Sequence, residues 1–231
     1  FVRLMGTQVE VVSTSGPERV ERLIVPGQGF GLGKMIEGTQ SYRTAIAARF
    51  ASEIAAGGSE RLYISRSQLP TGRGNLIGEA ALEAHLARQG YTVYHPEKHD
   101  LTAQIATYKA AKQVIAAEGS ALHLLAMVAR PDQQVAIVVR RPSGATRQLE
   151  KHLQRFAGID PLMISRLARS WKPLGAAKSR LWMGELDMPA LQEALAESGF
   201  IARDAAPWPA LAPEEVQAQL GDRFEIVHQS G

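Results

Sequence analysis

The residues best suited to bind a phosphate group are consecutive and form the segment Glu118-Gly119-Ser120-Ala121-Leu122-His123. The segment joins an apolar run at 114–117, typical of a buried strand, to a helical pattern at 121–129. Gly119 lets the backbone approach a ligand closely, and Ser120 is expected to cap a helix whose free N–H groups favour an anion. His123 would face the same ligand, and Glu118 would accept hydrogen bonds from sugar hydroxyl groups. The segment also fits an ordinary strand-to-helix turn with a surface histidine, and both interpretations stay open.

A second polar group follows another apolar run, at 61–65. Arg66 comes directly after Ser65 at the end of this run, and Arg73 lies between two glycines in the next loop. Because the carboxyl ends of parallel strands meet at one edge of a sheet, Arg66 is expected beside the first segment. Two arginines and a helix N-terminus would clamp a diphosphate. Surface arginines beside a polar loop are the alternative, above all for Arg73.

The elements that would position these residues alternate between strand and helix. Strands are predicted at 61–65, 91–94, 114–117 and 134–140, and helices at 75–89, 101–111 and 121–129. This alternation predicts an α/β fold, with a Rossmann-like parallel sheet and right-handed crossovers.

The flanking regions are predicted from weaker patterns. A short strand is expected at 22–26 and a helix at 41–56. After residue 142 the chain is expected to be mainly helical, with helices at 147–156, 188–197 and 213–220 and an edge strand at 223–228. The glycines at 27–33 do not form a phosphate loop, because the positions around Lys34 lack both the required glycine and the required Ser or Thr.

Composition excludes several classes of protein. The 231 residues include no cysteine, and the six histidines show no metal-ligand spacing. The net charge is only +3, so Arg140-Arg141 and the basic residues at 147–180 are interpreted as solvated faces, and no nucleic-acid partner is expected. No apolar stretch reaches the ~20 residues that span a bilayer, and no signal peptide is recognised. A cytoplasmic location is expected, with peripheral membrane association left open.

The two polar segments together resemble glycosyltransferase family 61, and bacterial capsular polysaccharide biosynthesis proteins are the most similar members. The resemblance covers about residues 20–142 and rests on three stretches, which are Tyr63-Ile64-Ser65-Arg66-Ser67, then Arg73, Asn75 and Glu79 ahead of Gly90-Tyr91, and finally residues 118–124. Two positions depart from the family pattern, since Glu118 replaces a commoner histidine and Leu124 a frequent asparagine.

This resemblance implies an inverting, metal-independent glycosyltransferase of GT-B type that needs no cofactor. A nucleotide sugar, expected to be a UDP-sugar, would be the donor and a polysaccharide or other glycan the acceptor. Residues 61–142 would form the donor-binding lobe, 1–60 the end of an acceptor lobe or a connecting segment, and 143–231 an extension of unknown role. The donor site would comprise Ser65, Arg66, Arg73, Glu118, Gly119, Ser120, Ala121, Leu122 and His123.

No residue is assigned as the catalytic base. A non-catalytic nucleotide- or phosphosugar-binding module is therefore the alternative function. Ester hydrolysis by Ser120 and His123 is disfavoured, because the Gly-x-Ser-x-Gly elbow is missing. The chain begins at Phe1 rather than Met, which is consistent with a piece of a longer protein.

Overall fold

The computed structural model describes residues 2–6, 9–31, 33–70, 74–141, 143–175 and 179–229. Within them a five-stranded sheet has the order β3-β1-β4-β5-β6, and all of its neighbouring strands are parallel. Its strands are β1 (Arg61–Ile64), β3 (Thr92–Tyr94), β4 (Gln113–Ala117), β5 (Gln134–Val138) and β6 (Leu162–Ile164). The predicted parallel α/β sheet is therefore confirmed.

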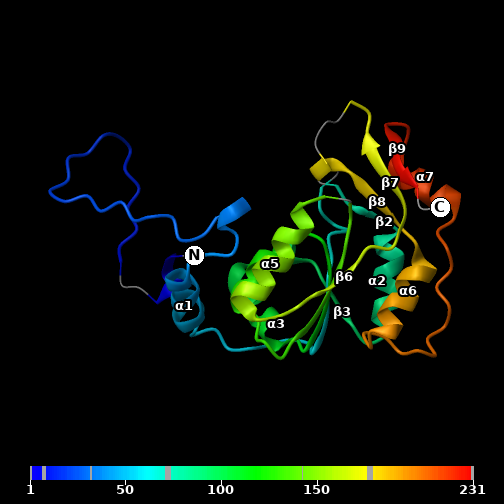
Figure 1. Ribbon diagram of the computed structural model, residues 1–231, viewed down its shortest axis with the longest axis horizontal. Coiled ribbons are helices and arrows are strands. Elements are labelled where there is room, and N and C mark those ends of the chain that lie inside the picture. The colour runs from blue at the N-terminus through cyan, green and yellow to red at the C-terminus, as the bar shows by residue number, and fades with distance from the viewer. Residues whose placement is uncertain are drawn as a thin grey trace.

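Helices cover both faces of this sheet (Figure 1). One face packs against α1 (Gln40–Arg49), α3 (Leu101–Ala110), α4 (Ala121–Val128) and α5 (Ala145–Ala157), and the other against α2 (Glu79–Arg88) and α6 (Met188–Glu197).

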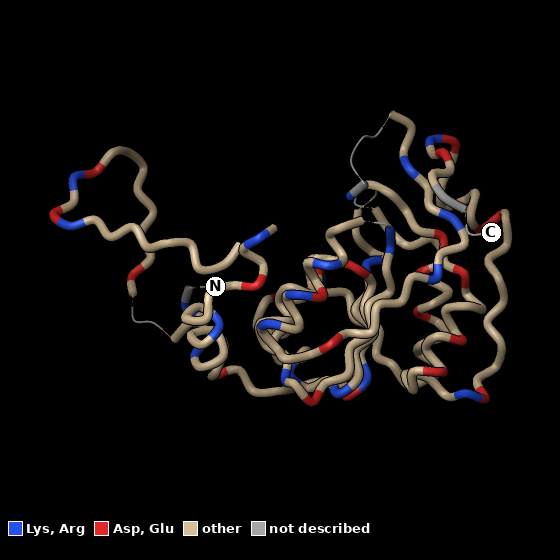
Figure 2. Tube along the Cα trace, in the orientation of Figure 1, with Lys and Arg blue, Asp and Glu red and all other residues tan. Residues whose placement is uncertain are grey.

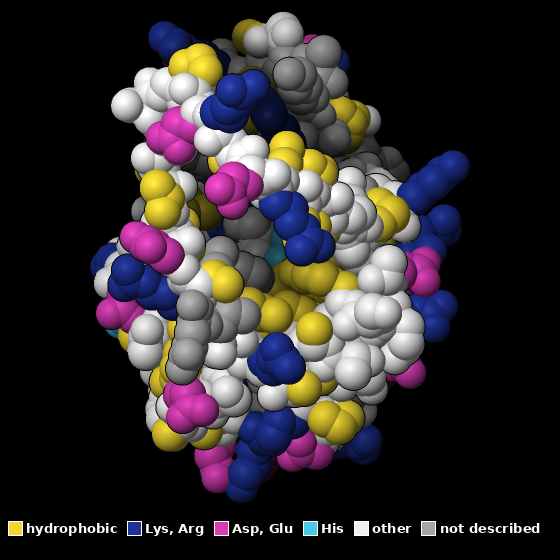
Figure 3. Space-filling view, turned by 90° about the vertical axis from the view of Figure 1, so that its left-hand side faces the viewer, with side chains coloured by type: hydrophobic (Ala, Val, Ile, Leu, Met, Phe, Trp, Pro, Cys, Tyr) yellow, Lys and Arg dark blue, Asp and Glu magenta, His cyan; other side chains and the backbone are white. Residues whose placement is uncertain are grey.

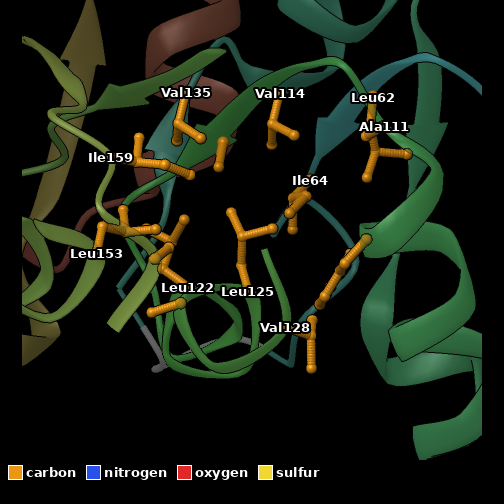
Figure 4. Packing of buried hydrophobic residues seen from close by; sticks show 14 of the residues in the cluster. Leu62, Ile64, Ala111, Val114, Leu122, Leu125, Val128, Val135, Leu153 and Ile159 are labelled. Atoms are coloured by element: carbon orange, nitrogen blue, oxygen red, sulfur yellow. The ribbon is translucent and has the colours of Figure 1, made fainter. Parts of the chain in front are cut away.

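The strands are buried on both faces because successive side chains alternate between them. Leu62 and Val114 point to the α4 side, whereas Tyr63 and Ile115 point to the α2 side, and all four are 0% exposed. Figure 4 shows the first of these layers, where strand residues meet Leu122, Leu125 and Val128 of α4. This packing fixes α4 against the sheet and so determines where its N-terminus lies.

A second sheet lies beside the first and has the order β2-β8-β7-β9. Its strands are β2 (Leu76–Ile77), β7 (Leu167–Pro173), β8 (Met183–Leu186) and β9 (Phe224–Gln229), and α7 (Pro213–Leu220) packs on it through Val216 and Leu220. The chain after residue 142 is thus a mixed α/β region, and the prediction that it is mainly helical is wrong. The predicted edge strand at 223–228 is present as β9.

The predicted domain boundary at 142 falls between two strands of one sheet. Strand β6 pairs with β5 in parallel, and α6 packs on the same sheet. The described residues also form four short 3₁₀ helices, which are η1 (Val2–Met5), η2 (Gly33–Met35), η3 (Pro96–Lys98) and η4 (Ser179–Leu181).

Three predicted elements differ from the structure. Residues 22–26 form no strand, and Leu23, Ile24 and Val25 are 68–80% exposed, because no second strand pairs with them in the described residues. Helix α1 was expected to continue to residue 56 but ends at Arg49. Two residues beyond this end, Ala51 takes a positive φ of 56°. The segment predicted as one helix at 75–89 contains β2 first, and Gly78 (φ 90°) separates that strand from α2.

Charged residues of both signs are interspersed along the trace (Figure 2). The face in Figure 3 likewise mixes basic, acidic and hydrophobic side chains. No helix among the described residues is long and apolar enough to cross a membrane.

Candidate functional site: an arginine-lined cavity at the sheet edge

A cavity of about 910 Å³ opens where the parallel strands end. Each of four neighbouring strands delivers a charged residue to its wall just beyond the last strand residue, namely Glu97 after β3, Arg66 after β1, Glu118 after β4 and Arg140-Arg141 after β5. Arg180 and Leu181 line it from the second sheet's region. Among the described residues the wall carries four arginines against two glutamates, which suits an anionic ligand.

Arg66 is held in place from both its backbone and its side chain. Its N–H donates to Glu79 Oε1 at 2.8 Å, and its Nη2 donates to the Gly74 carbonyl at 3.3 Å. The guanidinium lies directly over Gly119, where a Cβ would come 2.5 Å from Nη1. Burial lowers the pKa of Arg66, while Glu79 and Glu118 oppose that shift. The predicted proximity of Arg66 to the 118–123 segment is confirmed, and Gly119 makes it possible.

Glu79 is the centre of the buried network behind Arg66. Its Oε1 also accepts hydrogen bonds from the Tyr63 hydroxyl at 2.9 Å and from Ser65 Oγ at 3.2 Å. Burial raises the pKa of Glu79, and these three hydrogen bonds act in the opposite direction. Ser65 is 1% exposed, and its hydroxyl oxygen also lies 2.5 Å from Glu83 Oε1, so the two carboxylates share its single proton. The structure therefore places Ser65 beneath the site, where it supports the turn that carries Arg66.

The Glu118 carboxylate binds both of the arginines that follow β5. Its Oε2 accepts the Arg140 N–H at 3.1 Å, and its Oε1 accepts from Arg141 Nε at 3.3 Å. The Glu118 side chain is only 2% exposed. Its carboxylate thus fixes the arginines, which differs from the predicted role of accepting hydrogen bonds from sugar hydroxyls.

Arg140 and Arg141 are not solvated, and that interpretation of the sequence was wrong. Arg140 is 4% exposed and donates from Nη1 to the Trp182 carbonyl at 2.7 Å and to the Arg180 carbonyl at 3.4 Å. Burial, with the repulsion of Arg141, lowers the pKa of Arg140 to about 10. Arg140 thereby ties the loop before β8 to the end of β5. The sequence could have indicated that Arg140 lies at the site, because it follows β5 as closely as Arg66 follows β1.

Helix α4 begins beneath the cavity, but Ser120 does not cap it. Ser120 is itself helical (φ −66°, ψ −22°), and its side chain makes no capping hydrogen bond. The predicted serine cap is therefore wrong. The N–H groups of Leu122 and His123 donate instead to the carbonyls of Gly119 and Ser120, at 3.2 and 3.0 Å. Gly119, Ser120 and His123 line the cavity, whereas Leu122 is 1% exposed in the core and Ala121 packs against that core. Leu122 and Ala121 thus fix the helix and are not among the cavity-lining residues.

His123 contacts a second histidine, which lies far from it in the sequence. Its Nδ1 lies 2.9 Å from Nδ1 of His152 on α5, and His152 is 0% exposed. Burial lowers the pKa of both rings, that of His152 to about 3 with a further contribution from His123. Both rings are therefore neutral at pH 7. Residues 29 positions apart give no local sequence pattern, so only the structure reveals this pair.

Two further observations concern the predicted site. Arg73 lies outside the described residues. The described part of the chain contains no group of three or more His, Cys, Asp or Glu that could hold a metal ion.

A parallel α/β sheet with an arginine-lined cavity at its carboxyl edge defines a Rossmann-like protein with a site for an anionic ligand. The family model that matches the chain is Glycosyltransferase 61, and the match covers residues 14–136. Since this is just over half of the chain, the protein belongs to glycosyltransferase family 61, as the resemblance implied. A comparison with curated proteins finds no match. The matched residues include Arg66, Glu97 and the 118–123 segment, while Arg140, Arg141 and Arg180 lie beyond them.

Proposed function

We propose that the cavity binds the diphosphate of a nucleotide sugar, with a UDP-sugar as the donor, and that the sugar is transferred to a glycan with inversion and without a metal. The observation that carries this proposal is that Arg66, Arg141 and the first residues of α4 line one cavity, with Arg66 over Gly119 and Arg141 paired with Glu118. Membership in a glycosyltransferase family supports it. The parallel sheet would then be the donor-binding lobe of a GT-B-type enzyme acting in the cytoplasm.

The charges of the cavity wall suit a leaving diphosphate. Glu118 holds Arg141 at the wall through an ion pair at 3.3 Å, and Arg66 and Arg180 line the same cavity. Arginine binds phosphate oxygens in a bidentate manner, and the positive end of the α4 helix dipole favours an anion. These groups would stabilise the negative charge that grows on the diphosphate as its bond to the sugar breaks.

Glu97 is the best-placed candidate for the catalytic base. It lines the cavity, its side chain is 27% exposed, and its ion-pair contact with His95 is long, at 4.0 Å. Its carboxylate would take the proton of the acceptor hydroxyl while that oxygen attacks the anomeric carbon, and the nucleoside diphosphate would leave from the opposite face. Glu118 is a poorer candidate because both of its oxygens accept hydrogen bonds from arginines.

Ligand-induced stabilisation tests the proposal. A nucleoside diphosphate at a hundredfold excess over its Kd would stabilise the fold by about 2.7 kcal/mol. For a chain of this size that corresponds to a rise in Tm of roughly 5–10 °C. We expect UDP to produce this shift, Arg66→Gln to abolish it, and Arg49→Gln, an exposed change at the end of α1, to preserve it. If no nucleoside diphosphate from a broad panel changes the Tm, the cavity is not a donor site.

The engagement of Glu118 by two arginines favours a second candidate, a non-catalytic module that binds a nucleotide or phosphosugar. Such a module would show the thermal shift but no release of nucleoside diphosphate from any donor. Release that depends on an added glycan acceptor would exclude it.

A further inference from the structure

The contact between His123 and His152 constrains where their protons lie. The two Nδ1 atoms are 2.9 Å apart, so one proton lies between them, and one ring donates while the other accepts. His152 packs in an aromatic cluster, stacked on Phe30 (centroids 4.9 Å apart) and edge-on to Phe156 (4.5 Å). His123 lines the cavity, and because its Nδ1 is engaged, Nε2 is the nitrogen left for a ligand.

The surroundings of His152 decide the direction of this hydrogen bond. Its Nε2 is buried and finds no hydrogen-bond partner among the described residues. If His152 accepted at Nδ1, its own proton would sit on Nε2 as an orphaned N–H in an apolar cluster. Orphaned buried N–H groups are rare and cost about 1–3 kcal/mol. With the proton on Nδ1, His152 donates to His123, and only an unprotonated ring nitrogen is left without a partner.

We propose that His152 is a positioning residue that holds His123 as the neutral Nε2–H tautomer, with this N–H directed to the cavity as a donor to an anionic oxygen of the ligand. The identity of that oxygen, a phosphate oxygen of the donor, rests on the proposed function. The tautomer itself does not. His123 would then supply a hydrogen bond without adding a charge, and it could not act as a general base, because its cavity-facing nitrogen already carries a proton.

The tautomers are measured on the unliganded wild-type chain by long-range ¹H–¹⁵N correlation at pH 7.5. We expect His123 to show a protonated Nε2 and an unprotonated Nδ1, and His152 the reverse. Assignment uses the single variants His123→Phe and His152→Phe. The opposite pattern, with a protonated Nδ1 on His123, would overturn the inference whatever ligand the cavity binds.

A kinetic cycle tests whether His152 acts through His123. Because charge grows on the diphosphate during bond cleavage, the N–H contributes more in the transition state than in the ground state. We expect His152→Phe to lower kcat for release of nucleoside diphosphate about tenfold with a smaller change in KM. The double variant should be no slower than His123→Phe alone, and His99→Phe, at an exposed histidine, should change neither constant.

The kinetic results test the positioning role of His152 and the proposed function separately. Additive losses in the double variant would show that His152 contributes only to the structure, which contradicts a positioning role. A wild-type chain that binds no nucleoside diphosphate would remove the proposed function, while the tautomer measurement would still confirm or overturn the proton arrangement.

Discussion

Acidification should destabilise this protein through His152. The ring is fully buried and its native pKa is about 3, against 6.5 in an unfolded chain. A group whose pKa is lowered by folding contributes its stability above the unfolded pKa and loses it as the pH falls toward the native pKa. The stabilisation is thus complete at pH 7 and is lost progressively from about pH 6.5 down to about 3.

The size of the effect follows from the shift. At pH 4.5 the unfolded imidazole is protonated and the native one is not. This pH lies 2 units below the unfolded pKa of 6.5 and above the native pKa of about 3. At about 1.4 kcal/mol per unit, His152 alone would cost about 3 kcal/mol of unfolding free energy between pH 7 and 4.5. The lowered pKa of His123 adds a loss of the same sign.

Urea denaturation of the wild type and of His152→Phe at the two pH values measures this contribution. Phenylalanine fits the aromatic surroundings of His152, so the variant should fold. Other groups also have shifted pKa values, which are lowered for Glu37 and Asp132 and raised for Glu79. Because these groups are present in both proteins, their contributions cancel when the two losses of unfolding free energy are compared. We expect the wild type to lose about 3 kcal/mol more than the variant. Equal losses in the two proteins would refute the reasoning.

Three further predictions concern the site and the core. Gly119→Ala should weaken nucleoside diphosphate binding at least tenfold, as measured by calorimetry, because the new Cβ would lie 2.5 Å from Arg66 Nη1. Unchanged affinity would contradict the packing of Arg66 on Gly119. Glu97→Gln should lower kcat for sugar transfer by a factor on the order of 10²–10⁴ while preserving the UDP thermal shift, whereas full activity would exclude Glu97 as the base. Leu125→Ala should lower the unfolding free energy by about 2–5 kcal/mol in urea titrations, since Leu125 is 0% exposed between α4 and the sheet, and a loss under 1 kcal/mol would show that this layer is loosely packed.

The strands and helices of the parallel sheet were predictable from the sequence because each is a local pattern. Apolar runs such as 114–117 are buried, and they need no distant partner to be recognised. Their alternation predicted a parallel sheet, and a parallel sheet places residues that follow its strands at one edge. Arg66, Glu118 and Gly119 were found for this reason.

Elements and roles that depend on distant partners were not predictable in the same way. The two residues of β2 form a strand only because they pair with β8, more than a hundred positions away, and residues 22–26 remain exposed for lack of such a pairing. The sequence placed Glu118 at the edge of the sheet but not in an ion pair with Arg141, and it gave no reason to bring His152 to His123. A local pattern determines where a polar residue leaves a strand. Whether its charge faces a ligand or forms an ion pair within the protein depends on which side chains the tertiary packing brings within hydrogen-bonding distance.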